Sequence, residues 1–281
     1  MDIKTVCVCG AGTMGSGIAQ LAAAHGFKTI QFDINTQVLQ KSQSAIEVNF
    51  ASLVAKGRMD MQTKNTALQQ LTFTNDINDC KADIIIEAVA EILDIKVDLF
   101  KKLAAVNSAT TVFASNTSSL SIAMIAAGVA HPERVAGMHF FNPAFIMKLV
   151  EVVRGEQTAD YVVDNLCALA TALGKTPVVC KDMPGFIVNR VARSYYLEAM
   201  HLVEQEGGTP EMIDELMESA GFKMGPFKLM DMIGIDINYS VSKIVYDALG
   251  QPERLEPSRL QQQLVEAGKL GRKTGEGFYP Y

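Results

Sequence analysis

A histidine and a glutamate, His139 and Glu151, stand in the apolar stretch GMHFFNPAFIMKLVEVV at residues 137–153. Ionisable side chains are rarely buried without a partner, so the two residues satisfy each other, take part in chemistry, or do both. Imidazole changes charge near neutral pH, and a carboxylate bonded to it fixes its tautomer and stabilises the imidazolium. The pair is therefore a candidate general acid–base, and a purely structural buried pair is the alternative.

Three other histidines are weaker candidates for proton transfer. His25 ends a predicted helix beside a glycine, His131 precedes a proline in a predicted loop, and His201 falls within a long predicted helix. His139 stands at the end of a predicted strand, where the sites of open α/β folds form. We therefore expect His139 to exchange the proton with a substrate.

A glycine-rich turn, GAGTMG at residues 10–15, follows a predicted strand and opens a predicted helix. In a dinucleotide-binding fold the first glycine permits a tight turn, the second admits the pyrophosphate, and the third packs helix against strand. The N terminus of the helix then offers N–H groups and a positive dipole end to the phosphates. The cofactor contacts expected here are Gly10, Gly12, Thr13, Met14 and Gly15.

A carboxylate, Asp33, ends the second predicted strand. At that place it accepts hydrogen bonds from both ribose hydroxyls of the adenosine and repels a 2′-phosphate. No arginine follows Asp33 closely, so the sequence favours NAD(H) over NADP(H). A plain glycine turn with a strand-capping aspartate is the alternative.

Strands and helices alternate along the chain up to about residue 183. The pattern predicts strands at 4–9, 27–33, 71–74, 82–90, 110–116, 134–140, 148–153 and 176–180, and helices at 13–26 and 36–57. Such alternation indicates a mainly parallel sheet with helices on both faces. Beyond this part only helices are expected, the first beginning near Pro184 and the second after Thr209 as its N-cap. We predict an α/β fold with a Rossmann-type domain at residues 1–183 and a smaller all-α domain at residues 184–281.

Composition and charge exclude several classes of protein. The chain has 281 residues, 48% of them hydrophobic and 20% charged, which is ordinary for a soluble globular protein. Its net charge of −6 argues against a general nucleic-acid binder. Because no apolar run is long enough to span a bilayer and no signal peptide is recognisable, we expect a cytoplasmic protein without membrane association.

The five cysteines are an odd number and widely spaced, which is typical of reduced thiols in the cytosol. Cys7 and Cys9 point to the same face of a predicted strand, but no second pair with zinc-site spacing follows. We therefore expect buried structural thiols and no metal site.

Four motifs, ASNTSSL, HFFNP, KLVEVV and PGFIVNR, occur in this order along the chain. Together they resemble the 3-hydroxyacyl-CoA dehydrogenase family, and the resemblance extends from VCGAGTMGSGIAQ to GRKTGEGFY. It is strongest to the short bacterial members, the 3-hydroxybutyryl-CoA dehydrogenases. The resemblance implies NAD-dependent interconversion of (S)-3-hydroxyacyl-CoA and 3-ketoacyl-CoA such as acetoacetyl-CoA, with no metal.

The same resemblance implies roles for four residues. His139 is the general base in oxidation and the acid in reduction, with Glu151 as its partner. Ser118 bonds the reacting oxygen near the nicotinamide, and Asn189 holds the substrate from the helical domain. Alternatives remain for the last two, because a serine-rich loop is often only a helix cap, as Ser121 is expected to be, and an asparagine early in a helix is often solvated.

Further contacts follow from the resemblance alone. Residues that match family positions near the cofactor are Glu91, Lys96, Asn142 and Lys273. Lys56, at the end of the long polar helix, matches a contact to the coenzyme A moiety, with a solvated lysine as the alternative. Ile92 stands where the family commonly has asparagine, a departure that bears on the cofactor geometry next to Glu91 and not on the reaction.

The helical domain is expected to form a homodimer. Its helices carry more methionines than a thin helical layer needs: Met212, Met217, Met224, Met230 and Met232. The alternative is that these side chains fill the domain's own core.

Two other functions share the glycine motif. A non-CoA hydroxyacid dehydrogenase of the 3-hydroxyisobutyrate type uses a lysine as its acid–base, against which the histidine–glutamate pair argues. A non-catalytic dinucleotide-binding protein of the same fold would not need all four candidate catalytic residues.

Overall fold

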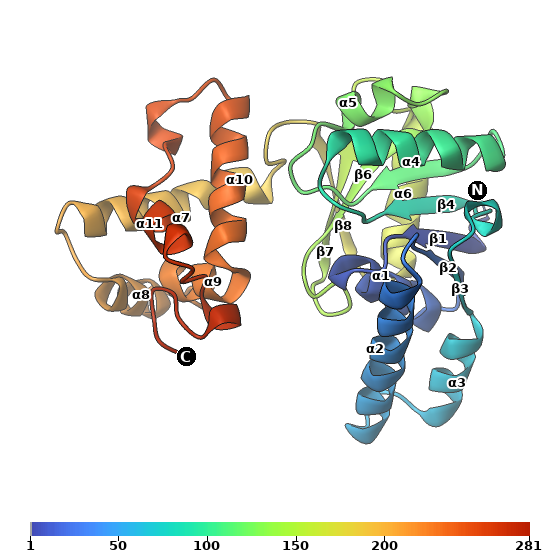
Figure 1. Cartoon of the computed structure of the whole chain (residues 1–281), viewed down its shortest axis with the longest axis horizontal. Coiled ribbons are helices and arrows are strands. Elements are labelled where there is room, and N and C mark those ends of the chain that lie inside the picture. Colours follow the sequence, from blue (N-terminus) through green and yellow to red (C-terminus); the bar gives the residue numbers. More distant parts are fainter. Residues whose placement is uncertain (1) are drawn as a thin grey trace. The chain divides into compact units, whose positions relative to one another are not determined.

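The computed structural model describes residues 2–281, and the chain divides into two compact units, Met1–Asp182 and Met183–Tyr281 (Figure 1). The division falls one residue before the limit expected at 183. No helix among the described residues has the length and apolar character that crossing a membrane requires.

An eight-stranded sheet forms the centre of the first unit, with the order β3-β2-β1-β4-β5-β6-β7-β8. The strands are β1 (Thr5–Cys9), β2 (Lys28–Phe32), β3 (Leu71–Thr74), β4 (Ile84–Glu87), β5 (Val112–Ser115), β6 (Val135–Phe140), β7 (Leu149–Arg154) and β8 (Thr176–Lys181). Within this sheet every neighbouring pair is parallel except β6 and β7, which are antiparallel. The strand order reverses between β1 and β4, and ligands of open α/β folds bind at the carboxyl ends of the strands at such a point.

Six helices flank the sheet: α1 (Thr13–Ala24), α2 (Thr36–Ala55), α3 (Met61–Gln69), α4 (Leu93–Val106), α5 (Ile122–Ala127) and α6 (Asp160–Ala172). Side chains of α1, α2 and α6 share one buried cluster with one face of the strands. On the other face Phe113 of β5 lies 5.4 Å from the Phe100 ring of α4, measured between centroids, and Figure 1 shows α4 and α1 on opposite sides of the sheet. Strands buried on both faces explain the continuous apolar runs of the sequence.

The second unit is helical and has its own core. Its helices are α7 (Val188–Glu204), α8 (Pro210–Ser219), α9 (Pro226–Ile233), α10 (Ile235–Ala248) and α11 (Arg259–Glu266). The Thr209 hydroxyl accepts the Met212 N–H and caps α8, as expected. The predicted fold class, a Rossmann-type α/β domain followed by a smaller helical domain, is confirmed.

The expected helix start near Pro184 is wrong. Gly185 and Phe186 have positive φ values of 74° and 47°, which are incompatible with a right-handed helix. The chain therefore turns after Pro184, and α7 begins only at Val188.

Candidate active site

The glycine turn between β1 and α1 has the geometry that a bound pyrophosphate needs. Gly10 has φ +110°, and a Cβ there would overlap the backbone of Ala88, while a Cβ on Gly15 would overlap the carbonyl of Gly10. A Cβ on Gly12 would meet nothing within 4 Å, so the turn faces open space at that residue. No side chain caps the N terminus of α1, which leaves its first-turn N–H groups available to an anion. The turn therefore fits a dinucleotide.

A cavity of about 710 Å³ lies on one side of this turn, with Asp33 and the apolar side chains of Ile34, Ile77 and Ile95 in its wall. The Asp33 carboxylate accepts the N–H of Ala11 at 2.8 Å through Oδ2 and the N–H of Asn35 at 2.9 Å through Oδ1. These bonds fix the carboxylate between the glycine turn and the start of α2. An adenosine in this cavity would meet apolar walls and a fixed carboxylate.

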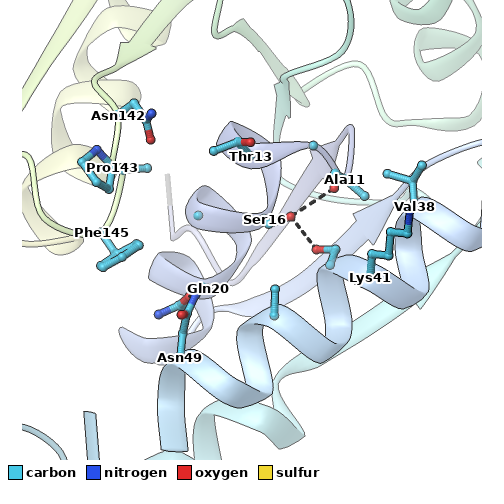
Figure 2. Close-up of a pocket in the computed structure, with 15 residues that line it drawn as sticks. Ala11, Thr13, Ser16, Gln20, Val38, Lys41, Asn49, Asn142, Pro143 and Phe145 are labelled. Carbon is cyan, nitrogen blue, oxygen red and sulfur yellow. Dashed lines mark hydrogen bonds between the residues drawn. The ribbon is translucent and has the colours of Figure 1, made fainter. Parts of the chain in front are cut away.

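A second cavity, of about 540 Å³, lies on the other side of the turn, between α1, α2 and the loop after β6 (Figure 2). Asn142, Pro143 and Phe145 of that loop face α1 there, and Lys41 and Asn49 come from α2. The wall on the α1 side is fixed by Ser16, whose hydroxyl donates to the Ala11 carbonyl at 3.1 Å and bonds the Ser42 hydroxyl at 2.7 Å. Thus a polar wall with a lysine adjoins the expected cofactor turn.

His139 and Glu151 are directly opposite each other on the antiparallel strands β6 and β7. His139 Nδ1 lies 2.8 Å from Glu151 Oε2, and the side chains are 7% and 1% exposed. The Phe141 ring packs against the imidazole with centroids 4.5 Å apart. The structure thus brings together the two residues expected to act as a pair, in a setting that strengthens a charge-assisted bond.

The loop after β5 carries Ser118 and is held by Glu91. Oε1 of Glu91 accepts the Thr117 hydroxyl at 2.6 Å, the Ser118 N–H at 3.0 Å and the Ser119 hydroxyl at 3.1 Å. Burial disfavours the ionised carboxyl of Glu91, but the charge of Lys96 and these hydrogen bonds outweigh it and lower its pKa. Glu91 is therefore a charged clamp on the loop.

Lys96 is a buried residue, 1% exposed, whose ammonium lies 2.6 Å from Glu87 and 3.1 Å from Glu91. Its direct contact with the cofactor stays a prediction. Ile92 is the N-cap residue of α4 and gives that helix no side-chain cap bond, which is the local consequence of its departure from the family pattern.

The remaining predicted residues lie elsewhere. Asn189 is the second residue of α7 and Lys273, in the second unit, bonds Asp236 at 2.6 Å. Lys56 is the exposed C-cap residue of α2. The Ser121 hydroxyl accepts the Met124 N–H, so the expected cap of α5 is confirmed.

Three site-forming residues were missed by sequence reasoning. Glu87 ends the buried strand IIIE, and a carboxylate at the end of such an apolar run could have indicated a functional residue. The side chain of Asn116 accepts the Phe140 N–H at 2.9 Å and ties the ends of β5 and β6 together. Lys175 donates to the carbonyls of Ala144 at 2.6 Å and Met147 at 2.8 Å, and burial lowers its pKa, but nothing in the local sequence marks it as buried.

Two family models cover almost the whole chain. The NAD-binding domain of 3-hydroxyacyl-CoA dehydrogenase matches residues 5–183, and the C-terminal domain of the same enzyme matches residues 185–281. The chain belongs to the 3-hydroxyacyl-CoA dehydrogenase family. The resemblance inferred from the four sequence motifs is thereby confirmed.

Individual relatives are similar to this chain over its full length. The chain is 47% identical over 283 aligned residues to a 3-hydroxyadipyl-CoA dehydrogenase of Escherichia coli, covering 100% of this chain but only 60% of that relative. It is 40% identical to a probable 3-hydroxybutyryl-CoA dehydrogenase of Deinococcus radiodurans, covering 98% of this chain and 99% of the relative. A crystal structure of (S)-3-hydroxybutyryl-CoA dehydrogenase from Ralstonia eutropha superposes with a TM-score of 0.96 at 38% identity, covering 100% and 99% of the two chains.

The family consists of NAD-dependent oxidoreductases that act on a CH–OH group, and the first unit is the family's NAD-binding domain. The prediction of NAD as cofactor and of the reaction class is thereby confirmed at the level of the family.

Proposed function

We propose that the protein interconverts (S)-3-hydroxybutyryl-CoA and acetoacetyl-CoA with NAD(H). The observation that carries this proposal is the buried bond of 2.8 Å between His139 and Glu151, near the carboxyl end of a strand that runs parallel to the cofactor-binding strands. The full-length relatives of Deinococcus radiodurans and Bacillus subtilis, both named probable 3-hydroxybutyryl-CoA dehydrogenases, support the substrate.

The histidine acts through its far nitrogen. Because Nδ1 faces Glu151, the proton of the 3-hydroxyl is taken up, and in reduction given back, at Nε2 of His139. Glu151 holds the ring in one orientation and stabilises the imidazolium formed during oxidation. Ser118 bonds the reacting oxygen. When bound, NAD+ accepts the hydride from C3 of the substrate in oxidation, and NADH supplies it to the same carbon in reduction.

Coenzyme A is a multiply anionic ligand, and α2 carries lysines that suit it. Lys41 and Asn49 line the second cavity, and Lys56 caps the end of the same helix. On a protein with net charge −6, these two lysines support binding of the nucleotide part of coenzyme A near α2.

The helical unit contributes Asn189 to the substrate and joins two copies of the chain in a homodimer. Support for the dimer comes from its many exposed large apolar side chains: Val191, Leu202, Met212, Leu216, Phe222, Met232 and Ile237. Of the five methionines on which the dimer was predicted, Met230 is buried in the core of this unit, and Met224 lies between α8 and α9 instead of in a helix. Five free cysteines support a cytoplasmic location, where thiols stay reduced.

A steady-state assay tests the proposal. Acetoacetyl-CoA should drive NADH oxidation, and His139→Gln should lower kcat about 10²-fold or more with NADH binding retained. Glu151→Gln should also lower kcat, because the imidazolium loses its counter-charge. Near-normal turnover in His139→Gln would remove this residue from the mechanism.

Alternative substrates belong in the same assay. Reduction of 3-ketoadipyl-CoA tests for the activity that the Escherichia coli relative is named after. Reduction of free acetoacetate tests for a dehydrogenase that does not use coenzyme A esters. NADH binding without turnover of any of these substrates would instead indicate a non-catalytic protein.

A further inference from the structure

A carboxylate with no role in the reaction described above lies completely buried behind the active site. Glu87 is the last residue of β4 and is 0% exposed. Its Oε1 accepts the Lys96 ammonium at 2.6 Å and the Val89 N–H at 2.7 Å, and its Oε2 accepts the Ser115 hydroxyl at 2.6 Å. Such a buried charge persists only where it is fully paired, so its position is tightly determined.

Lys96 connects this carboxylate to the site. Its ammonium lies between two carboxylates, with Glu87 on the buried side and Glu91, whose side chain is 36% exposed, on the outer side. Lys96 is thus held in place by Glu87 and in turn holds Oε2 of Glu91.

Glu91 is held by Lys96 and in turn holds the backbone of Ser118. With Oε2 on Lys96, its other oxygen is directed at the loop and binds the Thr117 hydroxyl and the Ser118 N–H. A second route joins the same two places, because the Ser115 hydroxyl donates to Glu87 and accepts the Thr117 N–H at 3.3 Å. Both routes begin at Glu87 and end on the loop that carries Ser118.

We propose that Glu87 is a positioning residue that acts through Lys96, Glu91 and Ser115 to hold Ser118 in its reactive place. The assignment rests on the proposed function for the role of Ser118 itself. A loop that carries a hydrogen-bond donor to the reacting oxygen must be held closely, since displacement by about 1 Å can cost about 10²-fold in rate. Glu87 touches neither substrate nor cofactor in this scheme.

The first measurement does not depend on activity. Glu87→Gln keeps the size of the side chain and removes its charge, so Lys96 loses its inner counter-charge and Glu91 is held less firmly. In the full chain without ligands, we expect faster hydrogen–deuterium exchange in a peptide covering residues 115–121. Unchanged exchange there would overturn the proposal.

The second measurement is a double-mutant cycle with Ser118→Ala. If Glu87 acts through Ser118, Glu87→Gln should lower kcat about 10-fold in the wild-type background and have almost no further effect in Ser118→Ala. Equal losses in both backgrounds would show that Glu87 does not act through Ser118 and would overturn the proposal. Absence of turnover in the wild type contradicts the proposed function instead, and the exchange measurement still decides the role of Glu87.

Asp83 provides a matched control at the opposite end of the same strand. It directly precedes β4, and its Oδ2 accepts the N–H groups of Lys4 and Thr5, both at 2.8 Å. Asp83→Asn should leave exchange at 115–121 and kcat as in the wild type, even where it lowers the melting temperature. If Glu87→Gln does not fold, Glu87→Asp keeps the charge but shortens the reach to Lys96 and Ser115, and the same loop should exchange faster.

Discussion

His139 and Glu151 depend on each other because both side chains are almost completely buried. Their bond follows from the antiparallel register of β6 and β7, which makes the two residues direct neighbours on one face. Removing either partner would leave a buried polar group without its bond. The pair was predicted from the residue types and their place in the sequence. The antiparallel register of β6 and β7 was not, because the sequence pattern predicted only a mainly parallel sheet.

Asp33 is the residue expected to select the cofactor, and the structure adds a second task. Because its Oδ2 accepts the Ala11 N–H, the carboxylate supports the glycine turn in addition to its proposed role at the adenosine ribose. Two substitutions separate these tasks. Asp33→Asn keeps an acceptor for Ala11 and removes the charge, whereas Asp33→Ala removes both.

We predict that Asp33→Asn raises the KM for NADH and so narrows the difference in KM between NADH and NADPH. The effect on kcat should be smaller, because the ribose is remote from the transferred hydride. Each charge-assisted bond lost is worth roughly 1.5–3 kcal/mol. Asp33→Ala should weaken both cofactors further because the turn is loosened. Kinetics with NADH and NADPH on wild type and both variants measure this. If the wild type prefers NADPH, or if both variants keep the wild-type preference, another residue selects between NADH and NADPH.

At the scale of elements, two loops at the carboxyl edge of the sheet are joined by a single side chain. Glu91, between β4 and α4, binds three donors of the loop after β5. Its pKa is lowered, because Lys96 and these donors outweigh the cost of burial. A carboxyl group with a lowered pKa in the folded state stabilises the fold above its usual pKa of 4.5, and the stabilisation is lost as the pH falls through the folded-state value.

We therefore predict that the wild type loses stability relative to Glu91→Gln on acidification. The difference in free energy of unfolding between the two should be constant near neutral pH and shrink as the pH falls below about 4.5. Urea unfolding of both proteins from pH 7 to pH 3 measures it. A difference that stays the same across this range would mean that Glu91 is not held as a charged clamp.

Element types were predictable and several element ends were not. The strands of the first unit occur where alternating patterns and apolar runs predicted them, since burial on both faces imposes that composition. The strand expected at 82–90 is only Ile84–Glu87, and the next residue, Ala88, lies so close to Gly10 that a Cβ on Gly10 would overlap its backbone. The positive φ values of Gly185 and Phe186 likewise move the start of α7 to Val188, later than the sequence pattern predicted.

On the scale of the whole molecule, the chain consists of two units with separate cores. The sheet core draws its side chains from residues 3–173, and the helical core draws its side chains from residues 192–279. Every strand, both cavities, the His139–Glu151 pair and the Glu91 clamp lie in the first unit. Asn189 and Lys273 lie in the second. The glycine turn and both cavities should therefore be separable from the proposed substrate contact of Asn189.

We predict that a fragment of residues 1–182 folds cooperatively and binds NADH but does not oxidise it with acetoacetyl-CoA. All residues of the sheet core lie within this fragment, whereas the proposed substrate contact of Asn189 is lost. It should also be monomeric, because it lacks the exposed apolar side chains proposed to form the interface, and the full chain should sediment as a dimer. The chain has no tryptophan, so calorimetry is the suitable measure of NADH binding, with the full chain as control. An unfolded fragment would mean that the two cores stabilise each other, and a fragment with full turnover would remove the helical unit from substrate binding.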